Sequence, residues 1–298
     1  MFARRIRTLS AHLCAARHYT LTAAPELASG SSIKVDLFAF EGKRAGQGCV
    51  LTLGKGPVNS LDTAFFKEMD ATCRLVSADD RVQSVVLASA FPKVFSAGLD
   101  FTPGVLVSPE EESFKAMWHS FQSSLATLHN LPKPLVVAVN GVAPAGGTVL
   151  ALAGDYRLAT PKCSMGLTEA AIGLVPPRWL DLMCQSAVGE KGAMRMLTQS
   201  RMLTSGDECL SFGLVDEVAE SDDLDALRER ACAVAEQLGG QWTTQSAVMK
   251  RRFRAETTSF FNQAGIDETW EYVKGSKHGG SPDFENFVTA FLSKRKKR

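Results

Sequence analysis

The sequence lacks the features that would place it in several specialised classes of protein. Its 298 residues contain no run of about 18 apolar residues, so no membrane-spanning helix is predicted. Basic and acidic side chains nearly balance, at 33 and 32, which argues against a dedicated nucleic-acid-binding protein. Glycine and proline occur in ordinary numbers, 24 and 12, so collagen-like and broadly disordered chains are excluded. The 45% of hydrophobic residues is enough for one large core or two smaller ones.

Local motifs for metals, disulfides and nucleotides are absent as well. The seven cysteines stand singly, without a CxxC pair, which is typical of reduced thiols. No histidine lies at ligand spacing from another histidine, a cysteine or an acid, so we predict no metal site. The sequence contains neither the GxGxxG nor the P-loop pattern of phosphate-binding loops, and no GxSxG pattern of hydrolases.

The near-neutral net charge of +1 hides two basic ends. Residues 1–25 contain four arginines and no acid, and residues 294–298 are all basic. An arginine-rich, acid-free N-terminus that also carries serine and threonine is typical of a mitochondrial presequence. We therefore predict a targeting presequence and linker over 1–25 and a location in the mitochondrial matrix. The alternative is a basic arm without a targeting role, and the basic C-terminal end is interpreted as a solvated tail.

The hydrophobic pattern predicts strands that alternate with helices over 30–222. Strands are expected at 33–41, 49–53, 85–88, 135–139 and 156–159, and helices after Ser60 or Asp62, over 110–129 and from Gly146 to Ala153. This alternation indicates parallel βαβ units and an α/β fold.

Residues 223–298 show a helical pattern without strand signals. An apolar stripe from Leu224 to Leu238 predicts a helix that ends at Gly239–Gly240. Further helices are expected near 243–254, 258–274 and 282–293. We therefore predict a C-terminal helical segment attached to the α/β core.

Three glycine-containing segments follow predicted strand ends: FSAGLD (95–100), PAGG (144–147) and GLTE (166–169). Small residues at such positions let a ligand approach the backbone closely. The N–H groups at a helix start, expected at Gly146–Gly147, are suited to binding a negatively charged oxygen. The same glycines could equally serve tight turns and packing, so these segments alone indicate only an α/β enzyme with backbone oxyanion donors.

Taken together, the motifs around these glycines resemble those of the crotonase (enoyl-CoA hydratase/isomerase) superfamily, and within it the mitochondrial 3,2-trans-enoyl-CoA isomerase branch. They are GPVNSLD (56–62), VFSAGLDF (94–101), NGVAPAGGTVLALAGDYRLAT (140–160), MGLTEAAIGLVPPRWL (165–180) and FGLVDEVAE (212–220). The resemblance implies a crotonase-type ββα spiral core with a C-terminal α-helical trimerisation segment, and hence a homotrimer. It also implies an acyl-CoA thioester substrate that brings its own coenzyme A, so that neither a separate cofactor nor a nucleic-acid partner is expected.

The resemblance implies that backbone N–H groups of Ala97 and Gly146 bind the thioester oxygen of the substrate. Proton removal beside a thioester carbonyl places negative charge on that oxygen, and one fixed donor typically stabilises the transition state by ~3–4 kcal/mol. The residues expected to line the substrate site are Ala97, Gly98, Leu99, Asp100, Phe101, Gly146 and Thr168.

The catalytic acid–base residue implied by the motifs is Glu169. Hydratases of the superfamily use two glutamates, and the first of these positions falls here on Val149, which cannot transfer a proton. Glu169 alone could take a proton from carbon 2 of a 3-enoyl-CoA and return it to carbon 4, as β-oxidation of unsaturated fatty acids requires. Its apolar neighbours, Met165 and Leu167 among them, are expected to raise its pKa from ~4.3 toward neutrality.

Two other functions stay open at this point. The first is an enoyl-CoA hydratase or other acyl-CoA lyase of the same fold, which Val149 disfavours. The second is a non-catalytic RNA-binding protein that uses the basic run 250–252 and the C-terminal tail, which the presence of Glu169 disfavours. Acyl-pocket candidates, each equally compatible with a place in the core, are Phe101, Trp118, Leu174 and Trp179, and Lys55 is one candidate for binding the phosphates of coenzyme A.

Overall fold

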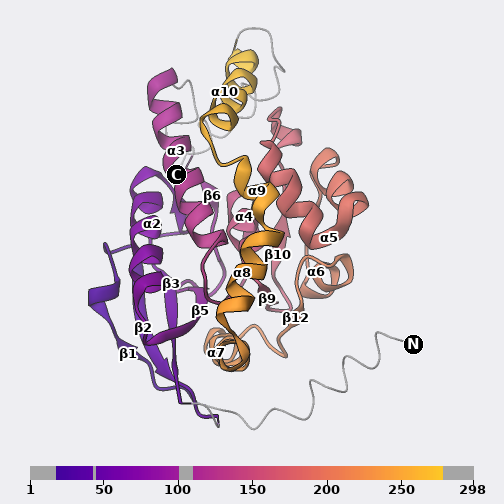
Figure 1. Cartoon of the computed structure of the whole chain (residues 1–298). Coiled ribbons are helices and arrows are strands. Elements are labelled where there is room, and N and C mark those ends of the chain that lie inside the picture. The colour runs from indigo at the N-terminus through magenta and orange to yellow at the C-terminus, as the bar shows by residue number, and fades with distance from the viewer. Residues whose placement is uncertain (1–17, 43–44, 101–109, 278–298) are drawn as a thin grey trace.

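A seven-stranded sheet lies at the centre of the computed structural model, which describes residues 18–42, 45–100 and 110–277 (Figure 1). In spatial order its strands are β1 (Thr22–Ala23), β2 (Ile33–Ala39), β3 (Gln47–Leu53), β5 (Val82–Ser89), β7 (Leu135–Val139), β9 (Tyr156–Ala159) and β12 (Glu217–Val218). The first three strands pair antiparallel, and every pairing from β3 onward is parallel. Parallel neighbours place their carboxyl ends at one edge of the sheet, and the loops at that edge carry the predicted site.

Two small sheets extend from this carboxyl edge. One pairs β4 (Ser60–Leu61) with β6 (Gly98–Leu99), and the other has the order β11 (Met202–Leu203), β10 (Ser164–Gly166), β8 (Val142–Pro144). The short helix α4 (Gly146–Leu152) follows β8 directly.

The other helices are α2 (Thr63–Ala78), α3 (Glu111–His129), α5 (Arg178–Thr198), α6 (Gly206–Phe212), α7 (Leu224–Gln241), α8 (Thr244–Phe253), α9 (Ala255–Ser259) and α10 (Gln263–Lys277), with 3-10 turns η1 (Pro25–Leu27) and η2 (Ala170–Ile172). Of these, α2, α3, α7, α8 and α10 lie in stretches where the apolar spacing predicts a helix, whereas α5 and α6 lie where none is predicted. Asp62 is the cap of α2, since its side chain accepts the Phe65 N–H at 2.8 Å. None of the helices within the described residues is long and apolar enough to cross a membrane.

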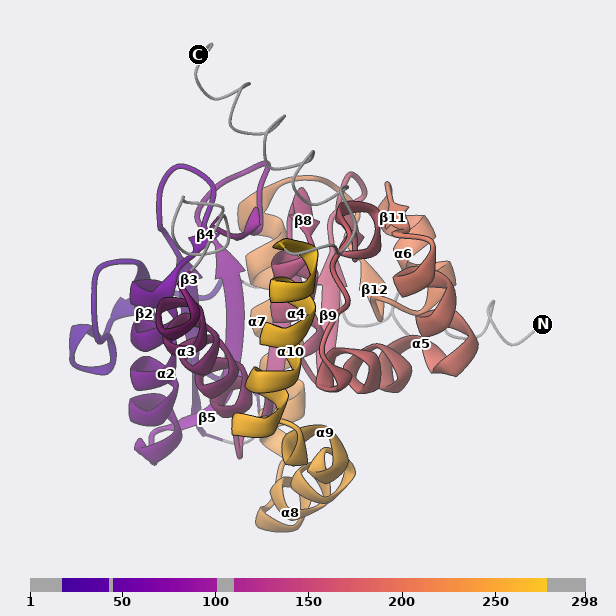
Figure 2. The ribbon, with the colours of Figure 1, turned by 90° about the horizontal axis from the view of Figure 1, so that it is seen from above.

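The central strands bury both of their faces, which explains their continuous apolar sequences. Val85, Leu87 and Val137 belong to the apolar cluster formed with α2 and α3. Their neighbours Val86 and Val136 point the other way, into the cluster formed with α7. Helices therefore cover the sheet on two sides (Figures 1 and 2), and the predicted α/β fold is confirmed.

One predicted helix boundary is wrong. The sequence places the end of α7 at Gly239–Gly240, but the helix continues to Gln241. A β-carbon on Gly239 would stand 2.9 Å from the ring of Phe40 and 3.1 Å from Ser84 Cβ, so this glycine lets α7 approach the sheet closely. The predicted presequence up to residue 17 and the predicted helix over 282–293 lie outside the described residues.

A buried ion cluster attaches α8 and α9, which Figure 2 shows at one end of the molecule, to the sheet. Asp155, just before β9, accepts the Leu135 N–H at 2.8 Å and pairs with Lys250 Nζ at 2.5 Å and Arg254 Nη2 at 2.9 Å. The Lys250 side chain is only 5% exposed, so the basic run 250–252 is not wholly on the surface. The Asp155 carboxylate is therefore the charge partner of both Lys250 and Arg254.

Removing that carboxylate is expected to destabilise the protein strongly. Asp155→Ala leaves two cations buried without their partner, which typically costs about 3–5 kcal/mol of unfolding free energy. Urea denaturation would measure the loss. The matched control is Asp222→Ala at the exposed pair with Lys162, where less than about 1 kcal/mol is expected. Equal losses in the two variants would contradict the role given to the cluster.

Candidate active site

Three segments that follow neighbouring strands meet at the carboxyl edge of the sheet. The segment 95–99 follows β5, the β8–α4 turn follows β7, and β10 with Glu169 follows β9. Backbone pairing joins them, because β8 runs parallel to β10 with Ala143 opposite Met165, and the Phe95 N–H donates to Val142 O of β8 at 3.0 Å. The structure thus brings the three predicted glycine-containing segments together.

The loop after β5 and the start of α4 approach each other closely, and glycine makes this possible. Gly98 has φ +83°, and a β-carbon there would stand 3.1 Å from Pro144 O and 3.2 Å from Gly146 N. In turn, the Leu99 nitrogen lies 3.2 Å from the point that a β-carbon on Gly146 would occupy. The backbone amides of Leu99 and Gly146 are therefore neighbours.

The prediction that Ala97 supplies an oxyanion donor is contradicted. Its N–H donates to Val58 O at 2.9 Å, and the N–H of Asp100 donates to Leu61 O at 2.9 Å. Successive N–H groups of a strand point to opposite sides, so the Leu99 N–H points away from β4 and toward Gly146. The amide available for a substrate oxygen is therefore that of Leu99, two residues beyond the predicted one.

Gly146 is placed as predicted, at the first turn of α4. Among the described residues no acceptor pairs with its N–H, as is usual at a helix start. The preceding Ala145 has φ 47° and ψ −114°, a strained conformation for a residue with a side chain, and its N–H donates to Gly166 O at 2.8 Å. Ala145 lies in the predicted PAGG segment, but no sequence pattern indicates its strained backbone, which precedes the start of α4.

Glu169 is the N-cap residue of the 3-10 turn η2, between the buried chain of β10 and helix α5. Its Oε2 atom is buried and has no hydrogen-bond partner among the described residues. Burial raises the pKa of this carboxyl to about 7, although hydrogen bonds from the backbone N–H groups of Glu169 and Thr168 lower it. Burial and then the charge of Glu169 raise the pKa of the Cys184 thiol, which places Glu169 beside α5. The expected pKa shift toward neutrality is present.

Comparison with known proteins places this geometry in a family. The family profile described as enoyl-CoA hydratase/isomerase matches residues 44–298. The chain belongs to the enoyl-CoA hydratase/isomerase family. Human mitochondrial delta3-delta2-enoyl-CoA isomerase has a similar structure, with a TM-score of 0.76 at 23% identity over 94% of this chain and 99% of that one. An enoyl-CoA hydratase from Bacillus halodurans gives 0.72 at 20% identity, over 87% and 100%. These neighbours confirm the crotonase-type fold.

Curated relatives match this chain at a higher sequence identity but over a smaller part of its length. Enoyl-CoA delta isomerase 1, mitochondrial, of Mus musculus is 36% identical over 177 residues, which cover 59% of this chain and 60% of the relative. The Homo sapiens protein of the same name is 34% identical over 192 residues, 63% of each. The match therefore spans about three fifths of the length of these relatives.

The other residues that the sequence singles out for this family member have different surroundings in the structure. Val149 is 2% exposed in α4, and Thr168 lies directly before Glu169. Lys55 Nζ pairs with Asp62 Oδ2 at 2.5 Å, so this lysine already has a charge partner. Trp118 and Trp179 pack edge-on against Phe121 in the core, whereas Phe101 lies outside the described residues.

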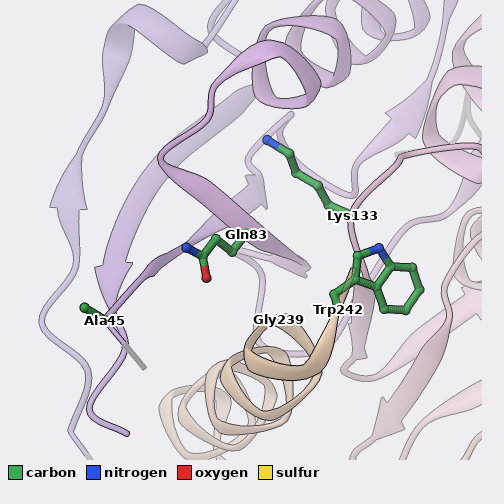
Figure 3. A pocket seen from close by; sticks show the side chains of 5 residues that line it. All are labelled: Ala45, Gln83, Lys133, Gly239 and Trp242. Atoms are coloured by element: carbon green, nitrogen blue, oxygen red, sulfur yellow. The ribbon is translucent and has the colours of Figure 1, made fainter. Parts of the chain in front are cut away.

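A separate cavity of about 340 Å³ is lined by Ala45, Gln83, Lys133, Gly239 and Trp242 (Figure 3). Gln83 lies near the start of β5 and Lys133 just before β7, so this cavity belongs to the amino edge of the parallel strands. The Lys133 amine donates to Val76 O at 2.7 Å and Asp79 O at 2.6 Å. The cavity is therefore remote from Glu169. No group of three or more His, Cys, Asp or Glu side chains suited to a metal occurs within the described ranges.

The raised pKa of Glu169 predicts a pH-dependent effect of Glu169→Gln on stability. A folded-state pKa of about 7, above the ordinary 4.5, favours the protonated form, so wild-type stability falls as pH rises between these values. Glutamine resembles the protonated form. The variant should therefore be more stable than wild type by roughly 2–3 kcal/mol at pH 8 and nearly equal to it at pH 4.5. Urea denaturation at both pH values tests this, with Glu190→Gln at an exposed position of α5 as the control. A difference independent of pH would contradict it.

Proposed function

We propose that the protein is an isomerase that converts a 3-enoyl-CoA to the 2-trans-enoyl-CoA in β-oxidation of unsaturated fatty acids. The observation that carries this proposal is the buried Oε2 of Glu169, which has no hydrogen-bond partner in the described part of the chain and lies on a segment paired with the β8–α4 turn that presents the Gly146 amide. The curated relatives named enoyl-CoA delta isomerase 1 support the same reaction.

Glu169 acts first as a base and then as an acid. Its carboxylate takes a proton from carbon 2, the electrons of that C–H bond form a double bond between carbons 1 and 2, and the thioester oxygen becomes negative. When this oxygen returns to a carbonyl, the double bond forms between carbons 2 and 3, and carbon 4 takes the proton from the neutral carboxyl. A pKa of about 7 suits both steps, because each form of the carboxyl is well populated near neutral pH.

The N–H groups of Leu99 and Gly146 bind the thioester oxygen while it is negative. Both belong to backbone that is fixed before substrate arrives, so little reorganisation accompanies the formation of charge. Each donor of this kind typically stabilises the transition state by ~3–4 kcal/mol. Coenzyme A enters as part of the substrate, and the mechanism uses no separate cofactor.

Water addition is the competing reaction for this fold. In hydratases of the superfamily two glutamates hold and activate the water, and the first of these positions is the buried Val149 here. The single carboxylate of Glu169 suits a proton shuttle, which needs only one group that takes and returns the same proton. Isomerisation is therefore favoured over hydration.

An assay with 3-enoyl-CoA and 2-enoyl-CoA, which scores 2-enoyl formation and water addition separately, tests the reaction. Wild type should isomerise rapidly and hydrate negligibly, and Glu169→Gln should lower kcat by about 10³-fold. The wild-type kcat/KM should rise with pH through about 7, because the free enzyme must hold Glu169 ionised. Faster hydration than isomerisation, or full activity of Glu169→Gln, would overturn the proposal, and Glu190→Gln is the matched control.

We further propose that the protein is a homotrimer held together by its C-terminal helices. Val248, Met249 and Phe253 of α8 are 60%, 51% and 85% exposed, although apolar side chains of this size normally avoid water. Burial against a second copy would stabilise the assembly by roughly 1.5–3 kcal/mol per side chain.

Phe253→Asp is therefore expected to dissociate the trimer. Sedimentation velocity should show a loss of about two thirds of the mass relative to wild type, because a buried unpaired carboxylate disrupts an apolar interface. Leu75→Asp, at an exposed leucine of α2, is the control and should remain trimeric. A monomeric wild type, or an unchanged Phe253→Asp trimer, would contradict this interface.

The location proposed is the mitochondrial matrix. The relatives are named as mitochondrial proteins, and the arginine-rich composition of 1–25 supports a presequence. The RNA-binding alternative loses support, since Lys250 of the basic run 250–252 is paired with Asp155 in the interior.

A further inference from the structure

A buried threonine hydroxyl links the two halves of the site. Thr148 of α4 is fully buried, and its Oγ1 donates to Ala143 O at 2.5 Å and accepts the Gly166 N–H at 2.8 Å. Thr148 comes two residues after Gly146, and Gly166 comes three residues before Glu169. The hydroxyl therefore joins the turn that presents an oxyanion donor to the strand that leads to the base.

Gly166 is held at both of its polar backbone groups by the same turn. Its carbonyl accepts the Ala145 N–H at 2.8 Å, and its N–H donates to Thr148. On the opposite side β11 leaves no room, because a β-carbon on Gly166 would stand 2.2 Å from Arg201 O. The end of β10 is thus fixed between the α4 turn and β11, and Thr148 supplies the side-chain bond across this contact.

We infer that Thr148 is a positioning residue, whose hydroxyl sets the placement of Glu169 relative to the Gly146 amide. The inference rests on the proposed function, in which these two groups act on one substrate at carbon 2 and at the thioester oxygen. Both must be in place at once, and a displacement of the order of 1 Å at such a site lowers the rate by about 10²-fold. Thr148 itself, a buried residue of α4, moves no proton.

The variants that test this differ only in the hydroxyl or the methyl group. Thr148→Val keeps the shape and removes both hydrogen bonds, whereas Thr148→Ser keeps the hydroxyl and removes the methyl group. Thr72→Val is the matched control, since Thr72 is another fully buried helical threonine, whose Oγ1 accepts the Ser29 N–H at 3.2 Å in α2. Should Thr148→Val not fold, Thr148→Ala removes the same bonds with less bulk.

Isomerisation of a 3-enoyl-CoA supplies the kinetic measurement. Thr148→Val should lose about 10²-fold in kcat with KM nearly unchanged, because binding is retained while the base is misplaced. Thr148→Ser should stay close to wild type, and Thr72→Val should lower the melting temperature without lowering kcat. A wild-type kcat for Thr148→Val, or a Thr148→Ser variant as slow as Thr148→Val, would overturn the inference.

Hydrogen exchange provides a measurement that does not depend on the reaction. In the peptide 163–169, the Gly166 amide should exchange faster in Thr148→Val than in wild type or in Thr148→Ser. The reason is that valine lacks the hydroxyl that accepts the Gly166 N–H. Unchanged exchange would show that the hydroxyl does not hold Gly166, and faster exchange with an unchanged kcat would show that it does not position the base. If wild type fails to isomerise 3-enoyl-CoA, the proposed function fails, and the exchange result still decides whether Thr148 holds the strand.

Discussion

The close approach of two backbones, at Gly98 and Gly146, is the contact on which the site depends. Each glycine occupies a position where a β-carbon would crowd the other segment at about 3.2 Å, so neither can carry a side chain without separating the two amides. The sheet makes the contact possible, since β5 and β7 are neighbours and end at the same edge. The cores on its two faces hold those strand ends in place, and the strained Ala145 directs the start of α4.

Glu169 shows how burial serves chemistry at a cost in stability. An exposed glutamate would ionise near its ordinary pKa and would be a weak base toward a carbon acid. The apolar surroundings of Glu169 raise its pKa to about 7, and its Oε2 is left without a partner among the described residues. A carboxylate in this setting opposes folding at neutral pH, and the packed core around β10 and α5 offsets that penalty.

Much of the fold could be predicted from the sequence because its signals are local. The strand over 135–139 is wholly apolar, the helix over 111–129 has regular apolar spacing, and Asp62 is a good cap for α2. Prediction failed at Gly239, which lies within α7 at a point where a β-carbon would stand 2.9 Å from the ring of Phe40. A glycine kept for close packing cannot be distinguished from a helix-ending glycine without knowledge of what packs against it.

For the candidate site, the kinds of residue and their order can be read from the sequence alone: glycines after two strands, a glutamate after a third, and valine at the position where hydratases of the superfamily have glutamate. The fold determines which backbone amide is available, because the Ala97 N–H donates to Val58 O whereas that of Leu99 faces Gly146. It also decided that the hydroxyl of Thr148 bridges α4 and β10. Such contacts cannot be read from the sequence because a backbone N–H has no side-chain signature, and its direction is set by hydrogen bonds to segments distant in the chain.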